Sequence, residues 1–186
     1  PKVIRFPFIL HSSYPHELLH NWWGNGVYID FNQGNWCEGL TVYLADHLVA
    51  EQRGKGRDYR RTSLQAFNDY VNESNDFPLT EFISRYDSAS SAIGYNKVMM
   101  MFDMLRSQVG DEAFIAALQR FYRDNIFTRA GYSEIATAFE QETDRSWQAF
   151  FDQWTQSRAA PTLELADAVV EKAGGEYELR LQLRQT

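Results

Sequence analysis

The chain has 186 residues, of which 44% are hydrophobic, enough to bury the core of one globular domain with a small appendage. Its net charge of −7 argues against nucleic acid or an anionic membrane surface as a partner. The sequence has no run of about 18 apolar residues, so no membrane-spanning segment is predicted.

The apolar sequence over residues 2–10 predicts a strand that leads into a helix. Ser12 or Ser13 can cap this helix, because a hydroxyl oxygen can accept a hydrogen bond from a free backbone N–H of the first turn. Pro15 suits the first turn, where a missing N–H costs nothing. A helix is therefore predicted to begin just before His16 and to include His16 and His20.

His16 and His20 are four residues apart, so both imidazoles lie on one face of the predicted helix and can bind one metal ion. Glu17 is turned about 100° round the helix from His16, where it can reach a water on the ion rather than the ion itself. Two imidazoles and an adjacent carboxylate are the groups that metal-assisted hydrolysis needs. The pattern predicts a zinc site, and an accidental match is the alternative.

A third ligand is expected, because catalytic zinc usually has three protein ligands and one open position. A histidine six residues after His20 would complete a metzincin site, but Gly26 stands there. Glu38 is the next candidate, since two histidines and a glutamate are a known ligand set of zinc peptidases. The alternative for Glu38 is a carboxylate that only stabilises the start of its helix.

The other histidines and the single cysteine are expected to have structural roles. His47 lies nine residues after Glu38 and on another helix face, which favours packing over metal binding. His11 precedes the histidine pair, and a structural role is favoured over one in the cleft. Cys37 is predicted to be a small packing residue rather than a zinc ligand, and one cysteine cannot form an internal disulfide.

Turn residues divide the rest of the chain into one short strand and a series of helices. The alternating pattern of residues 27–31 predicts the strand, and residues 128–131 are predicted to form a turn. Residues 72–78 and 87–94 are predicted loops, the second one lining the cleft. Helices are predicted over residues 36–53 and 58–71, from Tyr95 and Gly110 onward, and after the capping residues Ser133 and Ser146.

Near the C-terminus the pattern changes from helical to alternating. Residues 163–165 and 177–183 alternate around Gly174-Gly175, which predicts a β-hairpin. The predicted organisation is a helical part over residues 1–158 and the start of an incomplete β-domain over residues 159–186. The fold class is therefore expected to be mainly α, with a short β-hairpin at the C-terminus.

Three segments resemble the M1 family of zinc aminopeptidases, the gluzincins. They are His-Glu-Leu-Leu-His-Asn-Trp-Trp-Gly-Asn at residues 16–25, Trp-Cys-Glu-Gly-Leu-Thr-Val-Tyr-Leu at residues 36–44, and Ile-Gly-Tyr-Asn-Lys at residues 93–97. The third is similar to the family's Tyr-x-Lys segment, whose tyrosine stabilises the transition state. The resemblance implies that role for Tyr95 and a thermolysin-like helical lobe.

The chain departs from the family pattern at several positions. The gap between His20 and Glu38 is one residue shorter than usual, and Cys37 stands where asparagine usually precedes the ligand glutamate. Ala45 stands where a supporting carboxylate is common, although Asp46 is adjacent and can substitute. Val98 stands where the family usually has a glycine directly after the Tyr-x-Lys segment. These departures indicate a divergent bacterial-type branch that keeps every candidate zinc ligand.

The resemblance implies that Zn²⁺, held by His16, His20 and Glu38, serves hydrolysis of peptide substrates, with Glu17 and Tyr95 as catalytic residues. Removal of N-terminal amino acids is the expected reaction. It also implies that the N-terminal domain of the parent protein is missing, so the fragment alone is expected to be weakly active or inactive. An endopeptidase with the same site and a non-catalytic metal-binding or partner-binding scaffold are the alternatives.

Overall fold

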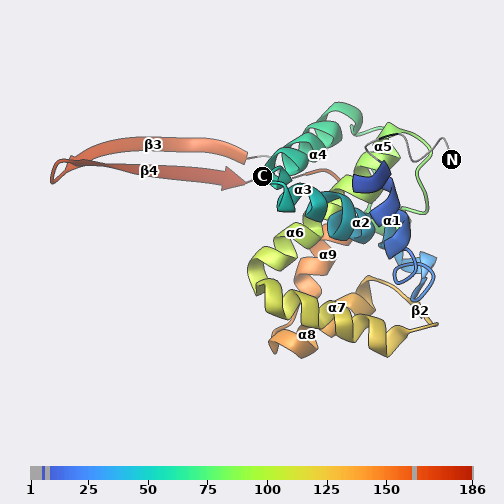
Figure 1. Ribbon diagram of the computed structural model, residues 1–186. Helices are drawn as coiled ribbons and strands as arrows, with labels where there is room; N and C mark the ends of the chain where they lie inside the picture. The colour runs from blue at the N-terminus through green and yellow to red at the C-terminus, as the bar shows by residue number, and fades with distance from the viewer. Residues whose placement is uncertain (1–5, 7–8, 161–162, 186) are drawn as a thin grey trace.

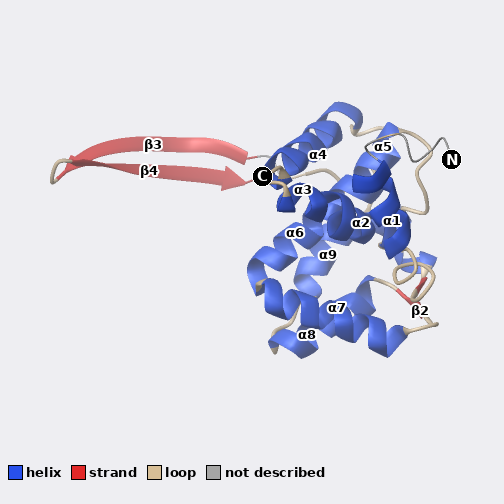
Figure 2. Ribbon diagram, in the orientation of Figure 1, coloured by secondary structure: helices blue, strands red, loops and turns tan. Residues whose placement is uncertain are grey.

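Helices make up most of the chain, and a β-hairpin extends away from them (Figure 1). The computed structural model describes residues 6, 9–160 and 163–185. The prediction of a mainly α fold with a C-terminal hairpin is confirmed, and Figure 2 shows how little of the chain is strand. The α-helices are α1 (Ser13–Leu19), α2 (Cys37–Val42), α3 (Leu48–Gln52), α4 (Gly56–Tyr70), α5 (Ser88–Ser91), α6 (Val98–Val109), α7 (Asp111–Asn125), α8 (Tyr132–Thr143) and α9 (Gln148–Gln156). No helix in this described part is both long and apolar enough to cross a membrane.

Two π-helical turns join neighbouring α-helices. Tyr43–His47 connects α2 to α3, so the helix predicted over residues 36–53 exists but contains one wide turn. Ala92–Lys97 connects α5 to α6, so Tyr95 lies inside a longer helix instead of starting one. A π turn accommodates an extra residue and changes which side chains face a neighbouring element.

The prediction of a loop over residues 87–94 is wrong, because most of this segment is helical. Asp87 accepts a hydrogen bond from the Ser90 backbone N–H (2.7 Å), and the Ser90 hydroxyl oxygen accepts one from the Asp87 N–H (3.0 Å). This reciprocal capping box starts α5 at Ser88. Several of the small residues that suggested a flexible loop are instead buried, among them Ala89, Ser90 and Ala92.

The predicted helix caps are only partly correct. Ser12 stands at the N-cap of α1, but its hydroxyl donates to Asp46 Oδ1 (2.7 Å) and makes no capping bond. Helix α8 begins before Ser133, at Tyr132, because Glu134 accepts a hydrogen bond from the Gly131 N–H (2.7 Å). The strand predicted over residues 2–10 lies largely outside the described residues, and its last two residues belong to the 3-10 turn Ile9–His11.

A short parallel strand pair and an aromatic cluster hold the loop that follows α1. Strand β1 (Tyr28–Ile29), part of the predicted strand, pairs with β2 (Arg129–Ala130), which replaces the turn predicted there. The fully buried Trp36 donates through Nε1 to the Ala130 carbonyl (2.7 Å). Trp23 packs against Trp36 and Phe121, with ring centroids 6.3 Å and 6.1 Å away. The start of α2 is therefore anchored beside the end of α1.

Helices α2 and α6 approach each other closely at Gly39. A Cβ at Gly39 would overlap the Val98 side chain, and Val98 is fully buried. This contact lies one residue after Glu38, so it sets the distance between the helix that carries Glu38 and the helical segment that carries Tyr95.

The predicted hairpin is confirmed and is longer than the pattern indicated. Strands β3 (Leu163–Ala173) and β4 (Glu176–Gln185) are antiparallel. Gly174 and Gly175 form the turn with φ of 61° and 94°, values that side chains with a Cβ rarely adopt. Alternation gives the hairpin one largely apolar face, which carries the exposed side chains Leu163, Leu165, Val170, Tyr177, Leu179, Leu181 and Leu183.

Candidate metal centre

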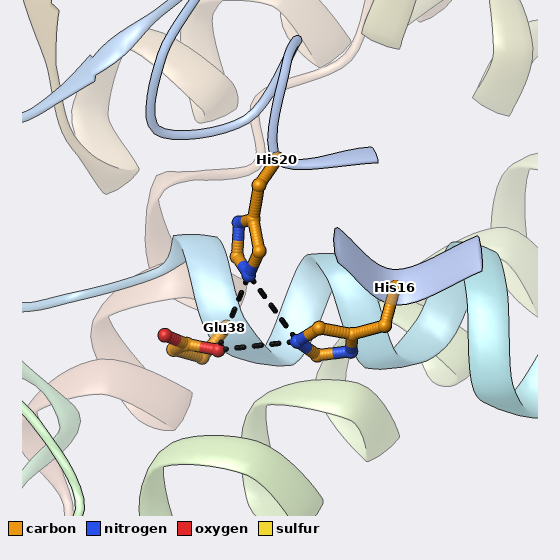
Figure 3. A group of neighbouring side chains, drawn as sticks. All are labelled: His16, His20 and Glu38. Atoms are coloured by element: carbon orange, nitrogen blue, oxygen red, sulfur yellow. Dashed lines mark hydrogen bonds and ion pairs between the residues drawn. The ribbon is translucent and has the colours of Figure 1, made fainter. Parts of the chain in front are cut away.

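Helices α1 and α2 bring His16, His20 and Glu38 together (Figure 3). The two Nε2 atoms are 3.2 Å apart, and Glu38 Oε2 lies 3.4 Å from His16 Nε2 and 3.6 Å from His20 Nε2. Ligand atoms about 2.0–2.1 Å from a tetrahedral zinc ion are about 3.3 Å from one another. The three side chains therefore fit one zinc ion without rearrangement.

His20 belongs to the same helical face as His16 although α1 ends at Leu19. As the C-cap residue it keeps helical backbone angles (φ −61°, ψ −13°), and its N–H bonds to the His16 carbonyl. The spacing of four residues therefore still places both imidazoles on one side. Glu38 comes from the first turn of α2, where a carboxylate is favoured by the helix dipole.

The second nitrogen of each imidazole has its own acceptor. His16 Nδ1 lies 2.8 Å from Asp46 Oδ2, and His20 Nδ1 lies 3.0 Å from the Trp23 carbonyl oxygen. Because Nδ1 is the donor in both contacts, each Nε2 keeps its lone pair for a metal ion. The chemistry of the donor set thus agrees with the distances.

Asp46 is the carboxylate that supports His16, and the π turn explains its position. The resemblance placed this group at residue 45, but Ala45 is buried in the core. The wide turn Tyr43–His47 shifts the helix register so that Asp46 faces α1. Its other oxygen accepts the Ser12 hydroxyl (2.7 Å), which holds the carboxylate from both sides. The substitution of Asp46 for the missing carboxylate, proposed from the sequence, matches this contact.

Replacing Asp46 with asparagine is expected to weaken zinc binding by about 10–100-fold. The charged acceptor that orients His16 would be lost, while the three candidate ligands would remain. Competition with a chelating dye measures the affinity. The matched control is Glu73→Gln on the exposed loop after α4, which should bind zinc normally. Unchanged zinc affinity in Asp46→Asn would show that His16 needs no such support.

The surroundings of the three candidate ligands favour positive charge on the two imidazoles. Burial opposes protonation of His16, but hydrogen bonds to Asp46 and Glu38 outweigh it and raise its pKa to about 9. Contacts with Cys37 and Glu38 raise the pKa of His20 to about 11. Burial of Glu38 is likewise outweighed by the two histidines, which lower its pKa to about 2. A divalent cation supplies this positive charge when it displaces protons from the ligands.

Glu17 and Tyr95 line the cleft over these three side chains. The cleft has a volume of ≈ 610 Å³, and Glu17 is exposed to it. Tyr95 is half-buried, and its proximity helps to lower the pKa of Glu38. Burial and the nearby charge of Glu38 raise the pKa of Tyr95, so the phenol stays protonated at neutral pH and can donate a hydrogen bond.

The remaining histidines lie away from the metal centre. His47 is buried, with its ring 5.1 Å from that of Tyr43 and its Nε2 2.8 Å from Arg60 Nη1, so it is a packing residue as predicted. Burial lowers the pKa of His47. His11 is exposed and does not line the cleft.

Cys37 is buried between the metal centre and the core. Its Sγ donates to the Trp23 carbonyl (3.0 Å) and lies 3.3 Å from His20 Nδ1. The thiol therefore lies on the Nδ1 side of His20, opposite to the Nε2 that points at Glu38, which agrees with a packing role.

Two further groups near the candidate ligands had no motif in the sequence that predicted a functional role. They are the Trp23 carbonyl, which contacts His20, and the Arg85 side chain, which lines the cleft.

Comparison with known proteins identifies the family. Residues 12–154 match the peptidase family M1 domain. The chain is 24% identical over 157 residues to glutamyl aminopeptidase from Bitis rhinoceros, covering 81% of this chain and 16% of that protein. It is 25% identical over 154 residues to aminopeptidase M1-B from Oryza sativa subsp. japonica, covering 80% of this chain and 18% of that protein. The chain thus spans less than a fifth of the length of these relatives.

Solved structures share the fold. An M1 zinc metallopeptidase from Deinococcus radiodurans is 25% identical with a TM-score of 0.61, over 79% of this chain and 33% of that chain. Aminopeptidase A from Legionella pneumophila, in complex with aspartic acid, is 23% identical with a TM-score of 0.58, over 91% of this chain and 19% of that chain. Together with the family match over most of its length, this likeness shows that the chain belongs to peptidase family M1.

Proposed function

We propose that this chain carries the zinc centre of an aminopeptidase and hydrolyses the peptide bond that follows a free N-terminal residue. The observation that carries the proposal is the convergence of His16, His20 and Glu38, with Glu17 exposed in the same cleft. The names of the relatives favour removal of N-terminal amino acids over cleavage within a chain.

The groups around the three candidate ligands have separate roles in this reaction. When bound, zinc supplies a Lewis acid that polarises the scissile carbonyl and makes water nucleophilic near neutral pH. Glu17 accepts the proton of the attacking water and passes it to the leaving amine. The Tyr95 phenol donates a hydrogen bond to the oxygen that becomes negative in the transition state. Asp46 and the Trp23 carbonyl hold the two imidazoles in the orientation that the distances require.

Metal content and aminoacyl hydrolysis test the proposal together. The purified protein is expected to bind one zinc ion per chain, measured by mass spectrometry of the metal. The intact protein should release a fluorescent amine from alanyl and leucyl reporters, and this activity should stop after chelation and recover when zinc is returned. The matched control is the same reporter with an acetylated amino group, which should not be cleaved.

The outcomes separate the proposal from the other two functions that the sequence allows. Equal cleavage of acetylated and free substrates would indicate an endopeptidase. Stoichiometric zinc without any turnover in the intact protein would indicate a metal-binding scaffold.

A further inference from the structure

Arg85 is a cationic side chain on the wall of the cleft that the proposed reaction does not use. We propose that Arg85 binds a carboxylate of the peptide substrate and thereby makes this enzyme selective for anionic peptides. The inference rests on the proposed aminopeptidase function, and it concerns which substrates are bound rather than how the bond is cleaved.

The guanidinium is held beside the reacting groups. Its Cζ lies 5.5 Å from the centroid of the Tyr95 ring, in a cation–π contact. Tyr95 in turn lies close enough to Glu38 to help lower the pKa of that carboxylate. A substrate whose carbonyl lies at the metal centre therefore extends past Tyr95 within reach of Arg85, because all three side chains line the same cleft.

The backbone around Arg85 is anchored at both ends. On one side, the Asn35 N–H donates to the Phe82 carbonyl (2.7 Å), and Asn35 Nδ2 donates to the Ile83 carbonyl (2.9 Å). On the other side, the Tyr86 N–H donates to Ser90 Oγ (3.0 Å) at the start of α5. Asn35 lies three residues before Glu38, so the segment that carries Arg85 is tied to the residues that lead into α2.

The charges of the cleft isolate this guanidinium. Among the residues that line the cleft, Glu17, Glu38 and Asp46 carry carboxylates, and Arg85 is the only arginine or lysine. In the described part of the chain no carboxylate lies within ion-pair distance of Arg85, whereas Arg60, Arg106 and Arg120 all have such partners. A guanidinium offers a planar pair of donors that matches a carboxylate. The donors of Arg85 are therefore available to a carboxylate of the substrate.

A second hollow begins where the first one reaches Arg85. It has a volume of ≈ 490 Å³ and is also lined by Arg85, together with Tyr70, Tyr86 and Asn96. The parts of a substrate peptide on either side of the bound carboxylate can therefore lie in the two hollows. The carboxylate can come from the C-terminus of a short peptide or from an aspartate or glutamate side chain, and the two sources are separated by the choice of peptides.

The test compares matched peptides on the wild-type protein and on Arg85→Gln. One pair differs only in a free or amidated C-terminus, and a second pair differs only in aspartate or asparagine at one position. For the carboxylate that Arg85 binds, we expect Arg85→Gln to lower kcat/KM by about tenfold or more, mainly through KM, and to leave the neutral partner unchanged. Arg85→Lys should lose part of this preference, because an ammonium cannot form the paired contact. The control Arg61→Gln, on the exposed face of α4, should change nothing.

Peptide binding gives a readout that does not depend on turnover. Calorimetry of the same peptides should show tighter binding of the carboxylate member to the wild-type protein and equal binding of both members to Arg85→Gln. If no reporter is hydrolysed but this difference in binding is present, the proposed function fails while the role of Arg85 stands. Equal loss for anionic and neutral peptides, or no loss for either, overturns the inference.

Discussion

Replacing Glu17 with glutamine is expected to lower kcat by about 10²–10⁴-fold while the protein still binds zinc. Glutamine keeps the size of the side chain but cannot accept the proton of the attacking water. Glu17 is not among the three side chains that converge on the candidate metal site, so the ligand set stays intact. Steady-state kinetics on an aminoacyl reporter measure the loss, and metal analysis of the same sample measures zinc.

Two controls make the Glu17 result specific. Glu73→Gln removes an exposed carboxylate on the loop after α4 and should leave kcat and zinc content unchanged. Glu38→Gln should instead reduce zinc content, because it alters a candidate ligand. Full turnover in Glu17→Gln would remove Glu17 from its role as general base.

Replacing Tyr95 with phenylalanine is expected to lower kcat by about 10²–10³-fold with a smaller change in KM. The variant keeps the aromatic ring that packs on Phe82 (centroids 6.1 Å apart) and loses only the hydroxyl. Kinetics on the aminoacyl reporter measure the effect. The zinc content shows whether Glu38, whose pKa Tyr95 helps to lower, still binds the metal ion.

The pH dependence of the rate supports the test of Tyr95. Because burial raises the pKa of Tyr95 above its ordinary value, the phenol should remain a donor up to about pH 10. Loss of a proton from Tyr95 should therefore not limit the rate of the wild-type protein below that pH. Tyr177→Phe, at a residue of β4 that is 72% exposed, is the matched control and should behave as wild type. A Tyr95→Phe variant with wild-type kcat would contradict a role in the transition state.

Local patterns identified much of the architecture. The hydrophobic periods located most helices, and the alternation around Gly174-Gly175 located the hairpin, since both depend on spacing along the chain. Small and polar residues were misleading over residues 87–94, where they form a capped helix against the core. Asp87 is a favoured N-cap residue and could have indicated this helix from the sequence, whereas the bond from the Asp87 N–H to Ser90 is seen only in the structure.

By itself the sequence determined that His16 and His20 share one helix face, because a spacing of four residues requires it. Only the tertiary structure decided that Glu38 meets them, that the π turn aims Asp46 at His16, and that the segment carrying Arg85 is tied beside the cleft. These contacts join residues far apart in the chain, and they depend on how buried groups such as Trp36 and Gly39 pack. Spacing along the chain is enough to predict a contact within one helix, such as that of His16 with His20. Contacts between distant segments depend on core packing and helix register, which spacing does not reveal.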